Sequence, residues 1–224
     1  MALSETSHML AAGAFPGPTT PSAPPLKDVA EVVRPVAWAA DRLLPVRSQV
    51  RGLFPDGGLR RGSTVVVSGS TSLALATMAA ASAEGSWCAG VGFVSLGLVA
   101  AAELGIELAR FALVPRPNRQ WSVVVAALLD ALDVVLVRPP VAVSASDARR
   151  LAARARERGS VLVPVLDRGT TWPQSDLHLS CTGREWQGVG AGHGHLSKQR
   201  LRVEVVGRGA ASRPRQALVA LAAS

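Results

Sequence analysis

A run of small polar residues lies between a β-branched segment and an alanine-rich segment: Gly69, Ser70, Thr71 and Ser72. A strand, a turn of this composition and a helix form the arrangement in which nucleotide-binding proteins hold phosphate groups with backbone N–H groups. That phosphate loop reads G-x-x-x-x-G-K-[ST], and its lysine reaches the β- and γ-phosphates. An ungapped alignment places Leu75 and Ala76 at the lysine and Ser/Thr positions. The segment therefore predicts a phosphate-loop site that has lost its ligands.

ATP hydrolysis also needs a carboxylate at the end of a neighbouring strand, where it organises Mg²⁺. The apolar segment 133–137 is the candidate strand, but it runs into Arg138, and Asp133 lies at its other end. The only lysines, Lys27 and Lys198, belong to distant parts of the chain. We therefore expect no ATPase activity and no nucleotide cofactor, and we expect that the protein is not an enzyme. One alternative stays open, because a helix N-terminus can still accept an anion through its N–H groups.

Three other sets of residues give weaker signals for chemistry. His193 and His195 lie in a glycine-rich turn without nearby cysteines or paired carboxylates, so we do not expect a metal site. No histidine is placed beside the serines at 68, 70 and 72, which argues against nucleophilic catalysis. Cys88 and Cys181 lie far apart in apolar segments, which favours two buried, reduced thiols over a disulfide.

Composition limits the class of partner. The chain has 224 residues, 48% of them hydrophobic, and a formal net charge of +8. This length suits one sizeable core with tails, and the positive charge favours an anionic partner such as DNA, RNA or an acidic protein surface. An arginine-rich and alanine-rich composition also fits a GC-rich genome, so a purely compositional explanation stays open. Five tryptophans, four phenylalanines and no tyrosine argue against a platform for base stacking.

No segment predicts export or membrane insertion. The N-terminus lacks the basic start and long apolar run of a secretory signal. The apolar segment 86–102 is interrupted by Gly90, Gly92 and Gly97, so a strand and a turn explain it better than a membrane span. We therefore expect a cytoplasmic, nucleoid-associated protein.

Strands and helices alternate through the middle of the chain. This alternation predicts an α/β fold with a mostly parallel sheet that is covered by helices on both faces. Residues 176–208 are predicted to form two further strands joined by a polar hairpin. We expect these two strands to lie antiparallel at the C-terminal edge of the sheet. Residues 1–25, rich in Pro and Ala, are predicted to be disordered, and 27–44 has helical spacing around Pro35. The expected strands are 64–67, 87–96, 111–114, 133–137 and 160–166, and the expected helices are 72–83, 120–132 and 145–159.

Several of these segments resemble the RecA-type core. The segment GLFPDGGLRRGSTVVVSG is similar to the entry into the RecA phosphate-loop strand, and AAELGIELARFALVPRP is similar to a later helix and strand. LLDALDVVLVRPP lies where the Walker B strand belongs, with Arg138 at the Walker B position, and RLRVEVVGRG resembles the last core strand. The resemblance covers residues 50–209 and implies a RecA-like sheet with a degenerate phosphate loop.

Within this superfamily the chain most resembles the shortened ImuA-type accessory proteins of actinobacterial mutagenesis cassettes. That resemblance implies a non-catalytic adaptor in SOS-induced mutagenesis and translesion DNA synthesis. It also implies binding to a Y-family polymerase homologue of the ImuB type and, indirectly, to an error-prone DnaE-type polymerase and the sliding clamp. The alternative is an inhibitor of cell division of the SulA-like kind, which binds a polymerising GTPase. The full set of RecA-like strands favours the adaptor.

The expected division of the chain is a disordered segment 1–25, a core 26–209 and a basic, apolar tail 210–224.

The arginine-rich helix predicted at 145–159 is either a solvated outer face or a contact for DNA or an acidic partner. Trp172 either folds onto the core or contacts a partner, and the tail is either flexible or docks a partner. The candidate contact residues are Arg149, Arg150, Arg154, Arg156, Arg158, Trp172, Arg208, Arg213, Arg215 and Leu218.

Overall fold

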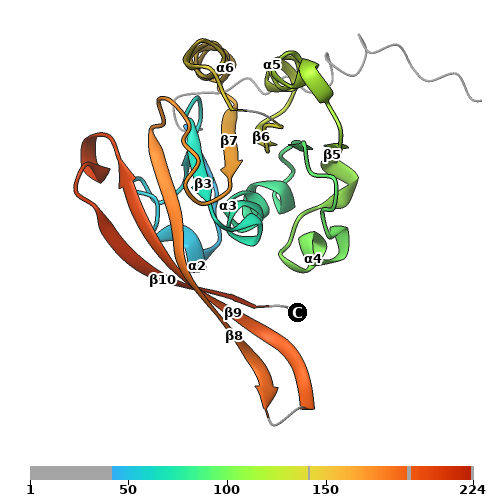
Figure 1. The fold of residues 1–224 in the computed structure, drawn as a ribbon, viewed down its shortest axis with the longest axis vertical. Coiled ribbons are helices and arrows are strands. Elements are labelled where there is room, and N and C mark those ends of the chain that lie inside the picture. Colours follow the sequence, from blue (N-terminus) through green and yellow to red (C-terminus); the bar gives the residue numbers. More distant parts are fainter. Residues whose placement is uncertain (1–41, 141, 191–192, 223–224) are drawn as a thin grey trace, which may run out of the picture. The chain divides into compact units, whose positions relative to one another are not determined.

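The computed structural model describes residues 42–140, 142–190 and 193–222 (Figure 1). The predicted disordered segment 1–25 and most of the predicted helix around Pro35 lie outside the described residues. A two-stranded sheet pairs β1 (Leu43–Leu44) with β2 (Leu59–Arg60). The main sheet has eight strands in the order β10-β9-β8-β3-β7-β6-β4-β5.

The strands predicted at 64–67, 111–114, 133–137 and 160–166 and the helices predicted at 72–83, 120–132 and 145–159 agree with the structure to within a few residues, whereas the strand predicted at 87–96 ends at Val91. The strands of the main sheet are β3 (Val65–Ser68), β4 (Cys88–Val91), β5 (Phe111–Val114), β6 (Val134–Val137), β7 (Val161–Leu166), β8 (Leu177–Gly190), β9 (His193–Gly207) and β10 (Arg215–Ala222). The helices are α2 (Ser48–Arg51), α3 (Thr71–Ala83), α4 (Leu98–Glu103), α5 (Trp121–Ala131) and α6 (Ala145–Arg158). Short 3-10 turns occupy Leu108–Arg110, Asn118–Gln120 and Gly209–Ala211.

Six neighbouring strands, from β5 across to β8, run parallel to one another. Strands β3, β4, β6 and β7 are buried along their whole length, as their continuous apolar sequences require. Strands β9 and β10 add antiparallel at one edge. The predicted α/β class, the mostly parallel sheet and the antiparallel C-terminal edge are therefore confirmed.

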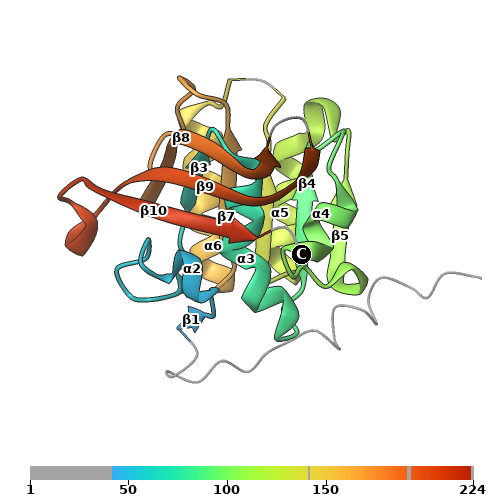
Figure 2. The ribbon, with the colours of Figure 1, turned by 90° about the horizontal axis from the view of Figure 1, so that it is seen from below.

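Helices cover both faces of the parallel strands, and each face has its own hydrophobic cluster (Figures 1 and 2). Helix α3 packs on one face with Val65 and Val67 of β3, while α5 and α6 pack on the other with Val66. Because successive side chains of a strand point to opposite faces, the alternation along β3 divides the core into these two layers.

The C-terminal segment forms part of the sheet. Strand β10 pairs with β9 along its whole length, from Arg215 opposite Val205 to Ala222 opposite Lys198. Val219 and Leu221 of β10 are buried in the core. The expectation of a separate tail from residue 210 is therefore wrong for 215–222, because alternating apolar residues give this segment one face that can be buried.

Candidate functional site

The connection between β3 and α3 holds only two residues, Gly69 and Ser70. Gly69 has a φ of +79°, and a Cβ added there would lie 3.1 Å from the carbonyl oxygen of Cys181. Ser70 caps α3, since its hydroxyl accepts a hydrogen bond of 3.1 Å from the backbone N–H of Leu73. A connection this short has no room for the successive N–H groups with which a phosphate loop surrounds phosphates.

The remaining polar groups of the turn bind other parts of the protein. The Ser70 and Ser72 hydroxyls are 3.0 Å apart, and Ser72 donates a 2.7 Å hydrogen bond to the side chain of Gln199 on β9. Leu75 and Ala76, at the positions of the missing lysine and Ser/Thr, are buried in the core. The turn therefore stabilises the packing of α3 against the antiparallel strands.

Arg138 follows β6 at its carboxyl end, where a magnesium-binding carboxylate would be needed. Its Nη2 donates a 2.9 Å hydrogen bond to Oγ1 of Thr71, and its guanidinium carbon lies 5.4 Å from the centre of the Phe93 ring. Gly92 packs against the Arg138 backbone so closely that a Cβ there would lie 2.1 Å from its carbonyl oxygen. These contacts hold a fixed positive charge at the strand end.

Asp133 lies at the opposite end of β6, as the sequence predicts. Its Oδ1 accepts a 2.8 Å hydrogen bond from Arg61, and its Oδ2 accepts a 3.0 Å hydrogen bond from the backbone N–H of Trp87. Both oxygens are therefore used to join β6 to neighbouring segments. This carboxylate stabilises the fold and is directed away from the β3–α3 turn.

A cavity of about 410 Å³, here called the arginine cavity, opens at the carboxyl ends of the parallel strands. Arg184, on β8, donates a 3.0 Å hydrogen bond to the carbonyl oxygen of Gly69. Arg168, in the loop after β7, comes so near Gly69 that a Cβ there would lie 3.2 Å from its side chain. The lining residues are Gly69, Ser70, Thr71, Arg138, Leu166, Asp167, Arg168 and Arg184.

The second and third arginines of this cavity were missed from the sequence. Arg168 lies in a turn-rich segment that signals a loop, and Arg184 lies in a long hairpin, 115 residues from Gly69. No local pattern links them to the turn after β3. Parallel pairing of β3 with β8 brings Arg184 to this turn, and parallel pairing of β3 with β7 brings Arg168 there.

A second cavity, of about 310 Å³, lies beside the arginine cavity and shares Thr71 and Arg138 with it. We call it the apolar cavity, because Leu75, Phe93, Leu96 and Leu104 line it. Its full lining is Thr71, Ser72, Leu75, Phe93, Val94, Ser95, Leu96, Gly97, Ala100, Leu104 and Arg138. The hydrogen bond between Arg138 and Thr71 lies in the wall common to the two cavities.

Three arginines around one cavity can bind an anion. A guanidinium presents its N–H groups in a fixed fork that matches a carboxylate or a phosphate. Asp167 is the one carboxylate in the lining of the arginine cavity, and Arg138, Arg168 and Arg184 form no ion pair within the described part of the chain. The site therefore carries excess positive charge and is suited to an acidic group.

Comparison with known proteins gives the family. Residues 52–174, more than half of the chain, match the family model described as the MT3502 N-terminal domain. The chain belongs to this family. It is also 34% identical over 159 residues to the uncharacterized protein Rv3395c of Mycobacterium tuberculosis, and the aligned region covers 70% of each protein. The family match includes Arg138 and Arg168, while Arg184 lies beyond it.

In this member of the MT3502 N-terminal domain family, a histidine does lie beside one of the serines. Nε2 of His178 is 3.2 Å from Oγ of Ser68, and the Ser68 hydroxyl lies 3.2 Å from that of Ser180. Parallel pairing of β3 and β8 places His178 there, which corrects the expectation from the sequence. Burial lowers the pKa of His178 below its usual value of 6.5, and nearby Glu204 opposes that shift. Ser68 is buried and lines neither cavity. The contact between His178 and Ser68 therefore joins β8 to β3 within the sheet.

The arginines of α6 fall into two groups. Arg150 donates to the hydroxyl of Ser122 and to Asp147, and Arg154 and Arg158 both bind Asp130 on α5. Arg149 and Arg156 lie on the other flank of the helix, are exposed, and form no ion pair within the described residues. Three of the five therefore join α6 to other groups of the domain, and only two extend into solvent without a carboxylate.

Trp172 is buried, which selects the first of its two alternatives, a tryptophan folded onto the core, and removes it from the candidate contact residues. Its side chain is 7% exposed, and its ring meets that of Trp121 edge to face, with centroids 6.4 Å apart. A tryptophan in a short loop can fold back onto helix α5, and here that burial removes it from the protein surface.

The other candidate contacts lie at the end of β9 and along β10. Arg208 and Arg213 are exposed, whereas Arg215 donates a 2.8 Å hydrogen bond to the carbonyl oxygen of Leu53 and thereby fixes β10 to the segment after α2. Leu218 is 76% exposed. Leu218 is therefore a large apolar side chain of β10 that is available to a partner.

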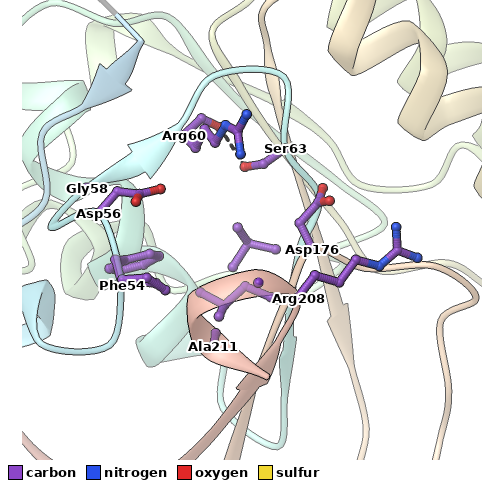
Figure 3. A pocket seen from close by; sticks show the side chains of 12 residues that line it. Phe54, Asp56, Gly58, Arg60, Ser63, Asp176, Arg208 and Ala211 are labelled. Carbon is purple, nitrogen blue, oxygen red and sulfur yellow. Dashed lines mark hydrogen bonds between the residues drawn. The ribbon is translucent and has the colours of Figure 1, made fainter. Parts of the chain in front are cut away.

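A third cavity, of about 250 Å³, lies at the amino ends of β3 and β8 (Figure 3). Its polar groups are partly used by the main chain, because Asp176 accepts a 2.9 Å hydrogen bond from the N–H of Thr64, and Ser63 donates to the carbonyl of Arg60. In Figure 3 the guanidinium of Arg208 points away from Phe54 and Ala211. Its lining combines apolar side chains with two carboxylates, Asp56 and Asp176, and two guanidiniums, Arg60 and Arg208, so this cavity lacks the excess positive charge of the arginine cavity.

Cys88 and Cys181 are free and buried, as expected. Burial and the nearby carboxylate of Asp133 raise the pKa of Cys88 to about 12.

No group of three or more His, Cys, Asp or Glu residues suited to a metal ion occurs in the described ranges. His193 and His195 begin β9, but their side chains are outside the described part of the structure. None of the helices within residues 42–140, 142–190 and 193–222 is long and apolar enough to cross a membrane.

Proposed function

We propose that this protein is a non-catalytic adaptor with a RecA-like core and a degenerate phosphate loop. The observation that carries the proposal is the two-residue turn between β3 and α3, with Arg138 beside it. Phosphoryl transfer needs phosphate positioning, magnesium and charge neutralisation together. A site with no N–H cradle, no lysine and no carboxylate at the end of β6 favours binding over hydrolysis.

The arrangement of the sheet supports the RecA-like part of the proposal. The turn follows β3, a central parallel strand, and the next helix packs over the sheet from that turn. Arg138 follows β6 on the same edge, where the resemblance places the Walker B residue. Antiparallel strands complete the sheet at its C-terminal side.

The resemblance to ImuA-type accessory proteins supplies the biological role that we propose. The protein binds a Y-family polymerase homologue of the ImuB type and helps organise an error-prone DnaE-type polymerase, with the sliding clamp, during SOS-induced mutagenesis. Its net charge of +8 adds weak, sequence-independent affinity for DNA and is consistent with nucleoid association. No cofactor takes part in this role.

The test is capture of the tagged full-length protein from damage-treated cells of its own host. We expect recovery of a Y-family polymerase homologue together with a DnaE-type polymerase. Recovery of a division protein would favour the SulA-like inhibitor instead, and recovery of neither class would contradict both roles. An unrelated tagged arginine-rich protein from the same host controls for capture by charge alone.

A second test addresses the proposed absence of catalysis. Titration calorimetry with ATP and magnesium is expected to give no saturable heat of binding, and a phosphate-release assay is expected to give no turnover. Saturable binding of Mg-ATP together with measurable hydrolysis would contradict the non-catalytic part of the proposal.

A further inference from the structure

The two adjoining cavities differ sharply in chemical character. The arginine cavity has guanidinium groups from three separate segments, at Arg138, Arg168 and Arg184, and one carboxylate, Asp167. The apolar cavity beside it is lined by aromatic and aliphatic side chains. One continuous ligand can therefore place an acidic group in the first and an apolar group in the second.

Excess positive charge marks the arginine cavity as a binding site for an anion. Arg168 and Arg184 are exposed, and neither forms an ion pair among the described residues. Nε of Arg138 is buried and has no hydrogen-bond partner. Arg138 as a whole is half-buried, so solvent screens its charge less than that of an arginine on an open surface, which strengthens its attraction for an acidic ligand in the cavity.

The rim of the apolar cavity is itself apolar and exposed. Val94 is 60% exposed and lines the cavity, while Leu98 and Val99, at the start of α4, are 42% and 75% exposed. Three large aliphatic side chains exposed on one short segment are typical of a surface that another protein covers. An aliphatic or aromatic side chain seated in a pocket is also the usual anchor of a protein interface.

We propose that the arginine cavity and the apolar cavity together dock a segment of a partner protein in which an acidic side chain lies next to an aliphatic or aromatic one. Charge complementarity selects the acidic residue, and Phe93, Leu96 and Leu104 receive its apolar neighbour. The proposal rests on the adaptor function proposed above and assigns a surface to it.

A nucleotide fits this surface less well than a peptide. The turn of Gly69 and Ser70 offers no cradle for a polyphosphate chain, and the one carboxylate of the lining, Asp167, stands beside Arg168. Phe93, the aromatic side chain of the apolar cavity, already lies against Arg138 and is not free to stack on a base. The apolar rim has no role in phosphate binding, whereas a peptide uses both cavities.

The experiment selects binders from a display library of random twelve-residue peptides on the full-length protein. We expect enriched peptides that contain Asp or Glu within a few positions of Leu, Ile or Phe. Affinity of a synthetic enriched peptide, measured by fluorescence anisotropy, should fall at least about tenfold in Arg168→Gln/Arg184→Gln and in Val94→Asp. These three side chains are exposed, so the variants should stay folded, with only a small fall in melting temperature from loss of the hydrogen bond between Arg184 and Gly69.

A matched control variant removes the same amount of charge elsewhere. Arg116 and Arg119 are exposed, lie between β5 and α5, and line neither cavity. The double variant Arg116→Gln/Arg119→Gln should therefore bind the enriched peptide with wild-type affinity. An equal loss in this control would show that net charge alone explains the binding, which overturns the proposal.

Three other results overturn it. The first is a library without an acidic and apolar consensus, and the second is an enriched peptide whose affinity ignores both site variants. The third is saturable binding of Mg-ATP that Arg168→Gln/Arg184→Gln abolishes, which would assign the site to a small anion.

A capture experiment in cells separates this proposal from the adaptor function. If wild type and Arg168→Gln/Arg184→Gln/Val94→Asp capture the polymerase homologue equally well, this surface is rejected and the adaptor function still stands. Failure of wild type to capture it would reject the adaptor function itself.

Discussion

At the scale of single residues, polar side chains near the ends of β3 and β6 form hydrogen bonds to other parts of the protein. Arg138 donates to Thr71, Ser72 donates to Gln199, and Arg184 donates to Gly69. Each bond joins segments far apart in the sequence. These contacts fix the turn between β3 and α3 and leave positive charge beside it.

The bond between Arg138 and Thr71 should appear as a coupling in a double-mutant cycle. Thr71→Val removes the acceptor, and Arg138→Met removes the guanidinium but keeps most of its length. We expect a coupling free energy of unfolding of about 2 kcal/mol, because a hydrogen bond to a charged group contributes about 1.5–3 kcal/mol. Urea unfolding of wild type, both single variants and the double variant measures it, and additive effects would show that the bond contributes nothing.

His178 should make stability depend on pH. Burial lowers the pKa of the folded-state imidazole below the usual 6.5, so the unfolded state binds more protons as pH falls through 6.5. The contribution to the free energy of unfolding is therefore complete above pH 6.5 and is lost as pH falls below it. Urea unfolding at pH 7.5 and pH 5.5 should show a smaller loss in His178→Gln than in wild type. Equal losses would contradict burial of a neutral histidine.

At the scale of elements, two carboxylates join neighbouring segments with different strength. Asp133 links β6 to Arg61 and to the backbone at Trp87, with its side chain only 12% exposed. Asp130 links α5 to Arg154 and Arg158 of α6, with the three side chains 33–41% exposed. Solvent screens the second set of ion pairs far more than the first.

Substituting each carboxylate by its amide should separate these two cases. Asp133→Asn is expected to lower the free energy of unfolding by about 2 kcal/mol, because it leaves a partly buried guanidinium without its countercharge. Asp130→Asn is expected to lower it by about 0.5 kcal/mol, and less in high salt. Urea unfolding at low and high ionic strength measures both, and equal costs would contradict the difference in burial.

Strand β10 should behave as part of the core. Deleting residues 210–224 removes the buried side chains of Val219 and Leu221 and exposes the outer edge of β9. We expect a loss of about 3 kcal/mol or more, from two buried aliphatic residues at about 1.5 kcal/mol or more each. Thermal unfolding followed by circular dichroism measures it. Leu218→Asp, at a solvent-facing position of the same strand, is the control and should unfold like wild type.

At the scale of the whole molecule, positive charge is distributed over many surfaces. The chain has 24 lysines and arginines against 16 acidic residues, yet three of the five arginines of α6 are bonded to neighbouring groups of the domain. This distribution favours weak attraction to any phosphate backbone over recognition of a base sequence.

Binding to DNA should accordingly be weak and salt-dependent. We expect two labelled duplexes of unrelated sequence to bind with the same affinity. We also expect the logarithm of the association constant to fall linearly with the logarithm of salt concentration, because binding releases counterions. Fluorescence anisotropy across a salt series measures both. A preference for one duplex, or affinity that salt does not change, would contradict this distribution of charge.

The sequence by itself determined most of the central strands and helices and the residues that follow β3 and β6. Continuous β-branched runs and alanine-rich segments predict the parallel strands and their helices, because burial on two faces and helix propensity are local properties. The absence of a lysine after Gly69 and the presence of Arg138 after β6 can be read directly from residue identity. The capping box of α6, from Ser144 to Asp147, was also predictable, and the hydroxyl of Ser144 does accept from the N–H of Asp147.

Only the tertiary structure decided which distant residues meet. Pairing of β8 with β3 brings Arg184 to Gly69 and His178 to Ser68, and pairing of β10 with β9 turns an expected tail into a strand. Folding of the loop after β7 buries Trp172 and places Arg168 at the arginine cavity. Strand register and loop packing depend on contacts between residues far apart in the chain, and a local pattern in the sequence does not contain them.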